Sequence, residues 1–353
     1  MKRLLITGLI FILLGCVMFT LTACSTNWSF GNSLRLREEK TQEVTESFNG
    51  IEIDTDVADI TLLPSEDGSC KVVSFDNKKI TYSAKVEGGI LKISEQDGRK
   101  WFQKMIGRGR SSLTVYLPER VYTSLTVSED TGNITVPADF TFGSIDLNLS
   151  TGDVSLRASA VDSIRINLST GDVRIENITC KSLDINHSTG HVDLNGVKAA
   201  TDVRITGSTG NTNVKGSSFG NLKVATSTGD ITMENVNCLA TLEVSVSTGD
   251  VALTSISCKD FISEGDTGKL KMTGVIATGE FNITRDTGDV KFNGCDASEI
   301  YVKTDTGDVE GTLLTEKIFI VRSDTGKINV PESVTGGKCN IITDTGDVKI
   351  SIE

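Results

Sequence analysis

The sequence predicts an all-β fold: a single-chain β-solenoid (β-helix) of about twelve coils of 19–20 residues, preceded by an irregular β leader. The dipeptide Thr-Gly recurs every 19 or 20 residues from Gly132 to Gly346, and a short fixed period is the signature of stacked repeats. Apolar and polar residues alternate on both sides of each Thr-Gly, as in strands with one buried face. Aromatic residues make up only 5% of the chain, which suits short strands joined by tight turns.

Residues 1–24 resemble a targeting segment. Lys2 and Arg3 precede an uncharged stretch that is long enough to cross a bilayer, and the basic residues favour a cytoplasmic amino terminus. Two interpretations stay open. The residues up to Cys24 resemble a lipoprotein signal, in which Cys24 is lipidated and the preceding segment is removed; alternatively, the stretch is retained as a single-pass anchor. Both predict an extracytoplasmic chain at a bacterial cell membrane. Residues 25–45 are polar, show no strand pattern, and are expected to form a spacer.

Residues 46–128 lack Thr-Gly but alternate in the same way, for example at Ile51 and Ile53. We expect a β leader that stacks on the first regular coil and covers its edge. Within it, residues 99–110 hold basic and aromatic side chains and no acid. This segment is expected to be a loop, which either rests on the membrane surface or covers the end of the core with Trp101 and Phe102.

Residues 129–353 carry the repeat. Around Gly171, for example, the apolar pairs are Ile164 and Ile166 before it, and Val173 and Ile175 after it. Each coil therefore has two main strands that meet at a Thr-Gly corner. Glycine suits this corner because it adopts positive φ without steric cost. The threonine falls in the inward phase and predicts a ladder of stacked hydroxyls. The structural glycines are Gly152, Gly171, Gly190, Gly210, Gly229, Gly249, Gly268, Gly288, Gly307, Gly326 and Gly346.

A second inward corner lies nine positions after most of the glycines, where seven residues are small or apolar: Cys180, Ala199, Phe219, Cys238, Cys258, Ala277 and Ala297. Cys238 and Cys258 occupy it in adjacent coils, where they form either a disulfide or two buried free thiols. The last strand ends near Glu353 with no cap after it. That open end predicts end-to-end self-association.

These motifs resemble a known family. Gly50–Pro64, with its alternating Ile-Glu-Ile and Ile-Thr-Leu-Leu-Pro, the Val-Tyr-Leu-Pro that ends at Pro118, and the serial Ser/Asp-Thr-Gly-Asp-Val are similar to a bacterial domain-of-unknown-function family labelled "putative adhesin". The resemblance covers about residues 46–353. It implies a β-solenoid outside a bacterial membrane, commonly behind an amino-terminal anchor, and it carries over no catalytic residues.

Two polar columns flank Thr-Gly. The column after the glycine is mostly aspartate, and the one before the threonine changes from serine to aspartate along the chain. Stacked carboxylates repel one another, so the columns are either a solvated, partly neutralised rim or a calcium site. The densest group, and the candidate metal ligands, are Asp286, Asp289, Asp305 and Asp308.

Other chemistry is not indicated. The two histidines, His187 and His191, are expected to be surface residues at one corner, and no catalytic motif surrounds them. The net charge of −12 argues against nucleic-acid binding, which needs a basic face. We therefore expect a non-enzymatic surface interaction or scaffold module with no cofactor other than possible calcium. Its expected partners are the membrane and an envelope protein or glycan. The alternatives are an envelope stress or sensory accessory that acts through a protein partner, and a self-assembling rod.

Overall fold

The computed structural model describes residues 38–76, 80–98 and 111–353. The 33 strands in these residues belong to one continuous sheet. Residues 39–353 form one compact unit, and the fold is the predicted β-solenoid, with successive turns spaced by about 20 residues. The targeting segment with Cys24, most of the expected spacer, and residues 99–110 lie outside the described residues. Among those described, no helix is long and apolar enough to cross a membrane.

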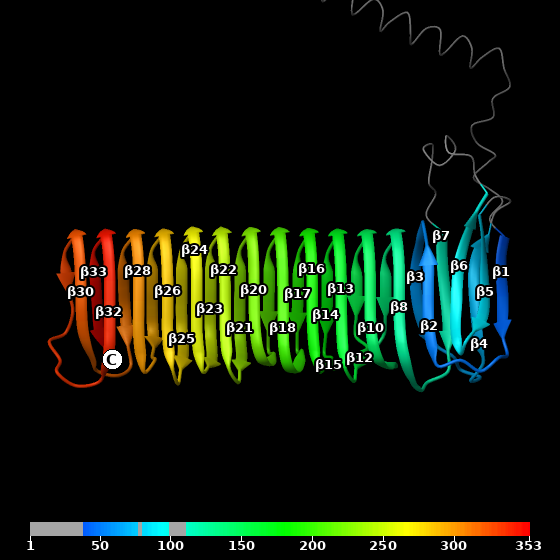
Figure 1. The fold of residues 1–353 in the computed structure, drawn as a ribbon, viewed down its shortest axis with the longest axis horizontal. Coiled ribbons are helices and arrows are strands. Elements are labelled where there is room, and N and C mark those ends of the chain that lie inside the picture. The colour runs from blue at the N-terminus through cyan, green and yellow to red at the C-terminus, as the bar shows by residue number, and fades with distance from the viewer. Residues whose placement is uncertain (1–37, 77–79, 99–110) are drawn as a thin grey trace, which may run out of the picture. The chain divides into compact units, whose positions relative to one another are not determined.

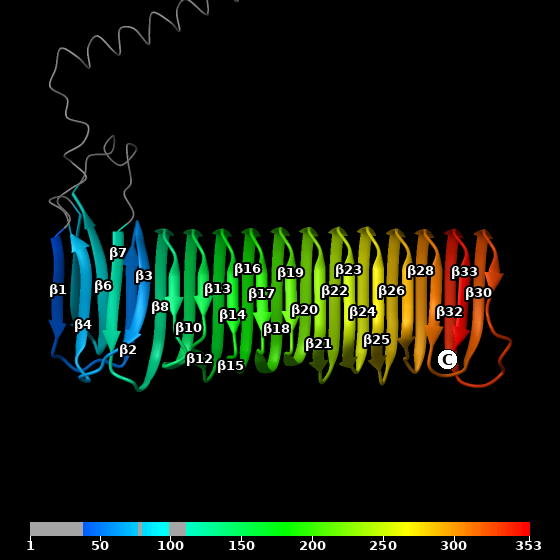
Figure 2. The same cartoon turned by 180° about the vertical axis from the view of Figure 1, so that it is seen from behind.

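The repeat builds two parallel ladders of strands, which run along the row of coils (Figures 1 and 2). Each strand of the first ladder ends at the threonine of Thr-Gly. In spatial order these strands are β8 (Val121–Thr131), β10 (Thr141–Thr151), β13 (Ser163–Thr170), β16 (Ser182–Thr189), β18 (Lys198–Thr209), β20 (Ser218–Thr228), β22 (Thr241–Thr248), β24 (Asp260–Thr267), β26 (Glu280–Thr287), β28 (Glu299–Thr306), β32 (Gly337–Thr345) and β30 (Lys317–Thr325).

The second ladder begins two residues after each glycine. It contains β9 (Ile134–Val136), β11 (Val154–Leu156), β14 (Val173–Glu176), β17 (Val192–Asn195), β19 (Thr212–Lys215), β21 (Ile231–Cys238), β23 (Val251–Cys258), β25 (Leu270–Ala277), β27 (Val290–Cys295), β29 (Val309–Leu313), β33 (Val348–Ile352) and β31 (Ile328–Asn329). Two short strands, β12 (Ser159–Ala160) and β15 (Thr179–Cys180), mark the second corner.

The core lies between the ladders and consists of the predicted alternating residues. Ile164, Ile166, Val173 and Ile175 are all buried, and equivalent residues stack above and below them in register. The second corner is buried as predicted, and the cysteines in the described residues are free thiols, including Cys238 and Cys258. Burial raises the pKa of both of these thiols to about 12.

The leader continues the solenoid and then caps it. β2 (Gly50–Thr55) pairs with β8, and β3 (Ala58–Pro64) pairs with β9, so together they form a coil without Thr-Gly. β6 (Ile90–Asp97) and β7 (Ser111–Leu117) stack on that coil in parallel. The cap consists of two antiparallel strands, β4 (Cys70–Asp76) on β7 and β5 (Ile80–Glu87) on β6.

A further strand, β1 (Glu38–Val44), lies within residues that we expected to be spacer. The expectation was wrong for this part because β1 is almost entirely polar and shows no apolar alternation. It pairs with β4, and its Gln42 side chain bonds to the backbone of β5, donating to the Tyr82 carbonyl at 2.9 Å and accepting from the Ala84 amide at 3.2 Å. Backbone pairing at a sheet edge, rather than burial, holds this strand.

The order of the last coils differs from the order of the sequence. β32 pairs with β28 on one side and with β30 on the other, so the final coil of the chain lies inside the stack. Both views show β30 outside the red β32 and β33 (Figures 1 and 2). The predicted open end near Glu353 is therefore wrong in position. The exposed end coil is β30–β31, and the Glu353 amide donates to Leu313 inside the stack at 3.0 Å.

Candidate functional site

The Thr-Gly corner is a close contact between coils. Ten of the eleven predicted glycines have φ between 135° and 159°, Gly326 being the exception. At Gly229, for example, a Cβ atom would lie 2.1 Å from the Gly210 carbonyl oxygen of the neighbouring coil. Glycine is therefore needed for two reasons: its φ and the space between the coils.

From Thr151 onward the threonines of this corner are exposed, and Thr131 is half-buried, so the predicted inward hydroxyl ladder is wrong. The reason is local. The register pairs Leu149 with Leu168 and Thr151 with Thr170 but leaves Ser150 unpaired, so the alternation breaks before the turn. The inward residue is instead the one three positions before the glycine, such as Leu149, Leu168 or His187.

The column after the glycine forms what we call the Asx ladder. In most coils, the side chain at this position accepts a hydrogen bond from the backbone amide of the same position in the next coil. The acceptors, with donor–acceptor distances of 2.7–3.2 Å, are Asp59, Asn133, Asp153, Asp172, His191, Asn211, Asp230, Asp250, Asp289, Asp308 and Asp347. Asparagine and the Nδ1 atom of His191 serve as well as aspartate because the ladder needs an acceptor and not a charge.

The candidate calcium ligands divide between two roles. Asp289 and Asp308 belong to the Asx ladder, and the Asp308 amide and the Lys269 ammonium hold the pKa of Asp289 below its usual range. Asp305 pairs with Lys303 at 3.3 Å, and Asp286 is exposed beside them. Among the described residues, the side chains that lie close enough to share one metal ion are instead Asp56, Glu95 and Asp97 in the leader. Calcium binding by the four aspartates stays a prediction.

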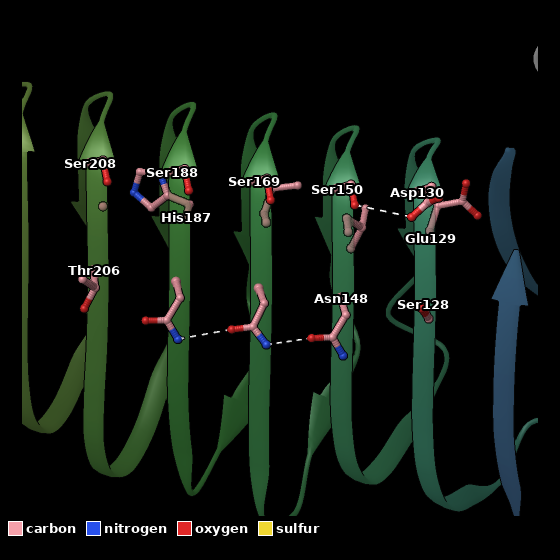
Figure 3. Close-up of a pocket in the computed structure, with 15 residues that line it drawn as sticks. Ser128, Glu129, Asp130, Asn148, Ser150, Ser169, His187, Ser188, Thr206 and Ser208 are labelled. Carbon is pink, nitrogen blue, oxygen red and sulfur yellow. Dashed lines mark hydrogen bonds between the residues drawn. The ribbon is translucent and has the colours of Figure 1, made fainter. Parts of the chain in front are cut away.

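The candidate binding site is a polar groove of about 410 Å³ on the outer face of β8, β10, β13, β16 and β18. Asn148, Asn167 and Asn186 run along it as a ladder, each amide donating to the next carbonyl at 2.7 Å and 3.3 Å (Figure 3). A second row of exposed hydroxyls follows the edge of the groove; its members are Ser150, Ser169, Ser188 and Ser208. We call this surface the Asn–Ser groove. Strand pairing repeats its polar groups about every 4.8 Å.

Two buried polar side chains line the same groove. Glu129 is 2% exposed and accepts from the Thr55 hydroxyl and from the amides of Ala58 (3.1 Å) and Thr131 (3.0 Å). Burial raises its pKa to about 7, against the effect of these donors. Because both of its oxygens are bonded, Glu129 joins the leader coil to β8 and is not a free acid.

His187 is also buried, so the expectation of a surface histidine was wrong for this residue, whereas His191 is exposed. Both ring nitrogens of His187 are buried without a hydrogen-bond partner. The ring fills the space over Gly207, where a Cβ atom would lie 2.3 Å from Nε2. Burial and the nearby His191 lower the pKa of His187. The ring therefore packs as a core side chain.

Arg285 on β26 shows the same packing in another coil of the stack. Its side chain is fully buried and occupies the space over Gly265, while Nη2 donates to the Ser263 hydroxyl at 2.8 Å. Burial lowers its pKa to about 10. The sequence analysis did not identify Arg285 as buried. Its side chain lies three positions before Gly288, and this position is recognised as inward-facing only when the alternation of buried residues is continued up to it.

The chain matches one protein-family model. The family model described as Toastrack DUF4097 matches residues 48–238 and 236–353. A search of curated proteins finds no match.

Solved structures of other bacterial proteins match most of this chain. A "putative lipid binding protein" from Parabacteroides distasonis is 15% identical, with a TM-score of 0.34, and the match covers 91% of this chain and 98% of that one. A "putative adhesin" from Bacteroides fragilis is 15% identical over 90% and 98% of the two chains, with a TM-score of 0.29. Another, from Parabacteroides distasonis, is 13% identical over 78% and 97%, with a TM-score of 0.36.

Proposed function

This chain belongs to the Toastrack DUF4097 family, and from that premise we propose that it is a non-catalytic, adhesin-like surface module of a bacterial envelope. Its amino-terminal segment holds it at the membrane, and the bulk of the chain faces outward. The module binds an elongated polar partner, for which a glycan of the envelope is our first choice.

The observation that carries this proposal is the Asn–Ser groove. Its amides and hydroxyls repeat at the strand spacing of about 4.8 Å, and such a row offers matched donors and acceptors to a polymer with repeating hydroxyl groups. Asn167 both donates and accepts within the ladder, so the row is ordered before a ligand arrives. Pre-ordering of polar groups lowers the entropic cost of binding.

The non-catalytic assignment rests on how the polar groups are used. Glu129 is committed to the backbone of the leader coil, and His187 is packed over Gly207. One exposed carboxylate, Asp130, lies in the groove and accepts from the Ser150 hydroxyl at 3.5 Å. Neither Glu129 nor His187 is placed to activate a serine beside it. The alternative partner is an envelope protein that binds the same amide and hydroxyl groups of the groove. In that case the chain would be a sensory or stress-response accessory.

The test is co-sedimentation of the described unit with isolated cell-wall polysaccharide. The fragment must begin at or before Glu38, because a later start would cut β1. Ser169→Tyr should block the groove and weaken binding at least tenfold. Ser247→Tyr is the matched control, because Ser247 is also exposed and occupies the same repeat position outside the groove. Equal binding by both variants would refute a role for the groove, and binding only to an envelope protein would favour the accessory.

A further inference from the structure

The end coil β30–β31 leaves core positions uncovered. Phe319, Val321 and Ile328 pair in register with Cys339, Ile341 and Val348 of the coil beneath. The three inner partners are 0% exposed, whereas Ile328 is 46% exposed and the other two are only partly buried. The end of the apolar core therefore faces solvent.

The outward side of the same strand is apolar as well. Ile318 and Ile320 are 38% and 53% exposed, and their partners on β32 are Lys338 and Asn340. At these two outward positions the end coil has isoleucine where the neighbouring coil has lysine and asparagine. Among the described residues, five of the nine exposed large hydrophobic side chains lie in this region, so the apolar surface is concentrated at one end: Leu314, Ile318, Ile320, Ile328 and Val334. Concentrated exposed apolar surface marks an interaction site.

The end coil also has free backbone edges. β30 pairs only with β32, and β31 only with β33, so one side of each strand is unpaired within the described fold. Lys317 fixes the start of β30 by a 2.6 Å ion pair with Asp296, and Lys317 itself is buried. The opposite end of the unit differs. Its outer strand is β1 (Figure 1), and the side chains of Glu39, Lys40 and Glu43 on that strand are exposed. Charged edge strands resist pairing, and the edge at β30 lacks that protection along Ile318–Val321.

We propose that the end coil is a homophilic docking surface, where two copies of this chain join end coil to end coil. A second copy fits for a geometric reason. The surface has two strand edges on either side of an apolar centre, and the same coil of another copy presents both edges at the same separation. Such a contact continues the coil-on-coil stacking that already connects β28, β32 and β30. A two-fold axis normal to the first ladder runs the two β30 strands antiparallel and closes the assembly as a dimer.

The pairing has a consequence for the proposed function. The β1 strands of the two copies lie at the far ends of the joined pair, so Glu38, the residue at which each described unit begins, lies at opposite ends of that pair. If the segments that precede Glu38 are anchors, as the proposed function holds, the dimer connects two membranes. This consequence rests on the proposed function, whereas the pairing itself does not.

The test of the pairing is sedimentation velocity of the full chain in a mild detergent, over about 1–100 µM. The wild type should change from one chain to two as concentration rises. Ile320→Lys should raise the midpoint at least about tenfold, because it places two like charges at the joint. Leu239→Lys is the control, since Leu239 is 74% exposed far from the end coil, and it should dimerise like the wild type.

A wild type that stays a single chain, an Ile320→Lys variant that dimerises normally, or a Leu239→Lys variant that is equally weakened would overturn the pairing. Growth beyond two chains would overturn the two-fold arrangement. For the consequence, vesicles of neutral lipid that carry the full chain should cluster, and Ile320→Lys should abolish clustering. Loss of glycan binding in Ser169→Tyr with intact dimers separates this inference from the proposed function.

Discussion

The Asx ladder predicts that Asp230 contributes an acceptor and not a charge. Its Oδ1 accepts from the Asp250 amide at 2.9 Å, and its own amide donates to Asn211 at 2.9 Å. Asp230→Ala removes one exposed hydrogen bond, which is worth about 0.5–1.5 kcal/mol net. For a chain of this size, that loss lowers the melting temperature by about 2–4 °C at most. Asp230→Asn keeps the acceptor and removes a carboxylate next to Asp250, so its melting temperature should match or exceed that of the wild type.

The assay is thermal unfolding followed by circular dichroism, together with amide hydrogen exchange at Asp250. Exchange gives a local reading, which matters because a solenoid can open coil by coil. The Asp250 amide should exchange faster in Asp230→Ala and at the wild-type rate in Asp230→Asn. If the asparagine variant were as unstable as the alanine variant, the charge would be the essential property and the ladder argument would fail.

Three further predictions concern the same corner. Gly229→Ala should destabilise by about 2–3 kcal/mol or more, because its Cβ meets the Gly210 carbonyl and φ is 142°; urea unfolding measures this, with Gly216→Asn as control. His187→Leu should raise the melting temperature, and more at pH 5 than at pH 8, because a lowered folded-state pKa costs stability as pH falls below about 6.5. Calcium should raise the melting temperature relative to chelator if the group Asp286, Asp289, Asp305 and Asp308 binds it.

Each of these has a clear contrary outcome. Gly216 has φ 54° and open space around it, so equal losses in the two glycine variants would show that coil contact is unimportant. A gain from His187→Leu that does not depend on pH would mean that the imidazole is not forced to stay neutral. Identical melts in calcium and in chelator would remove the metal hypothesis for the aspartate group.

Local pattern was sufficient to predict most of the architecture. Three predicted features are properties of a single coil: the 19- or 20-residue period, the apolar pairs on both sides of Thr-Gly, and the small second corner. The structure confirms the spacing of the turns, and the residues of the pairs and of the corner are buried. The glycine corner was also predictable. A position that needs positive φ favours glycine, so a glycine that recurs in each coil of the repeat marks such a position. The Asn–Ser groove could have been found by reading the outward column four positions before the glycine, where Asn148, Asn167 and Asn186 repeat.

The remaining features depend on contacts between coils. The outward threonines, the Asx ladder and the packing of His187 over Gly207 follow from the inter-coil register, in which Ser150 is left unpaired. β1 was missed because it is held by edge pairing and by Gln42 rather than by an apolar face.

The structure of a single coil was therefore predictable from its residues, whereas the order in which the coils stack was visible only in three dimensions. Repeats with the same pattern can stack on one another in more than one order, so nothing in their alternation places β32 between β28 and β30. Only the three-dimensional stack shows that the coil ending at Glu353 lies between two other coils and that Ile318, Ile320 and Ile328 lie at the end. The physical reason is that strand pairing is non-local: which edge stays open depends on every other pairing in the sheet.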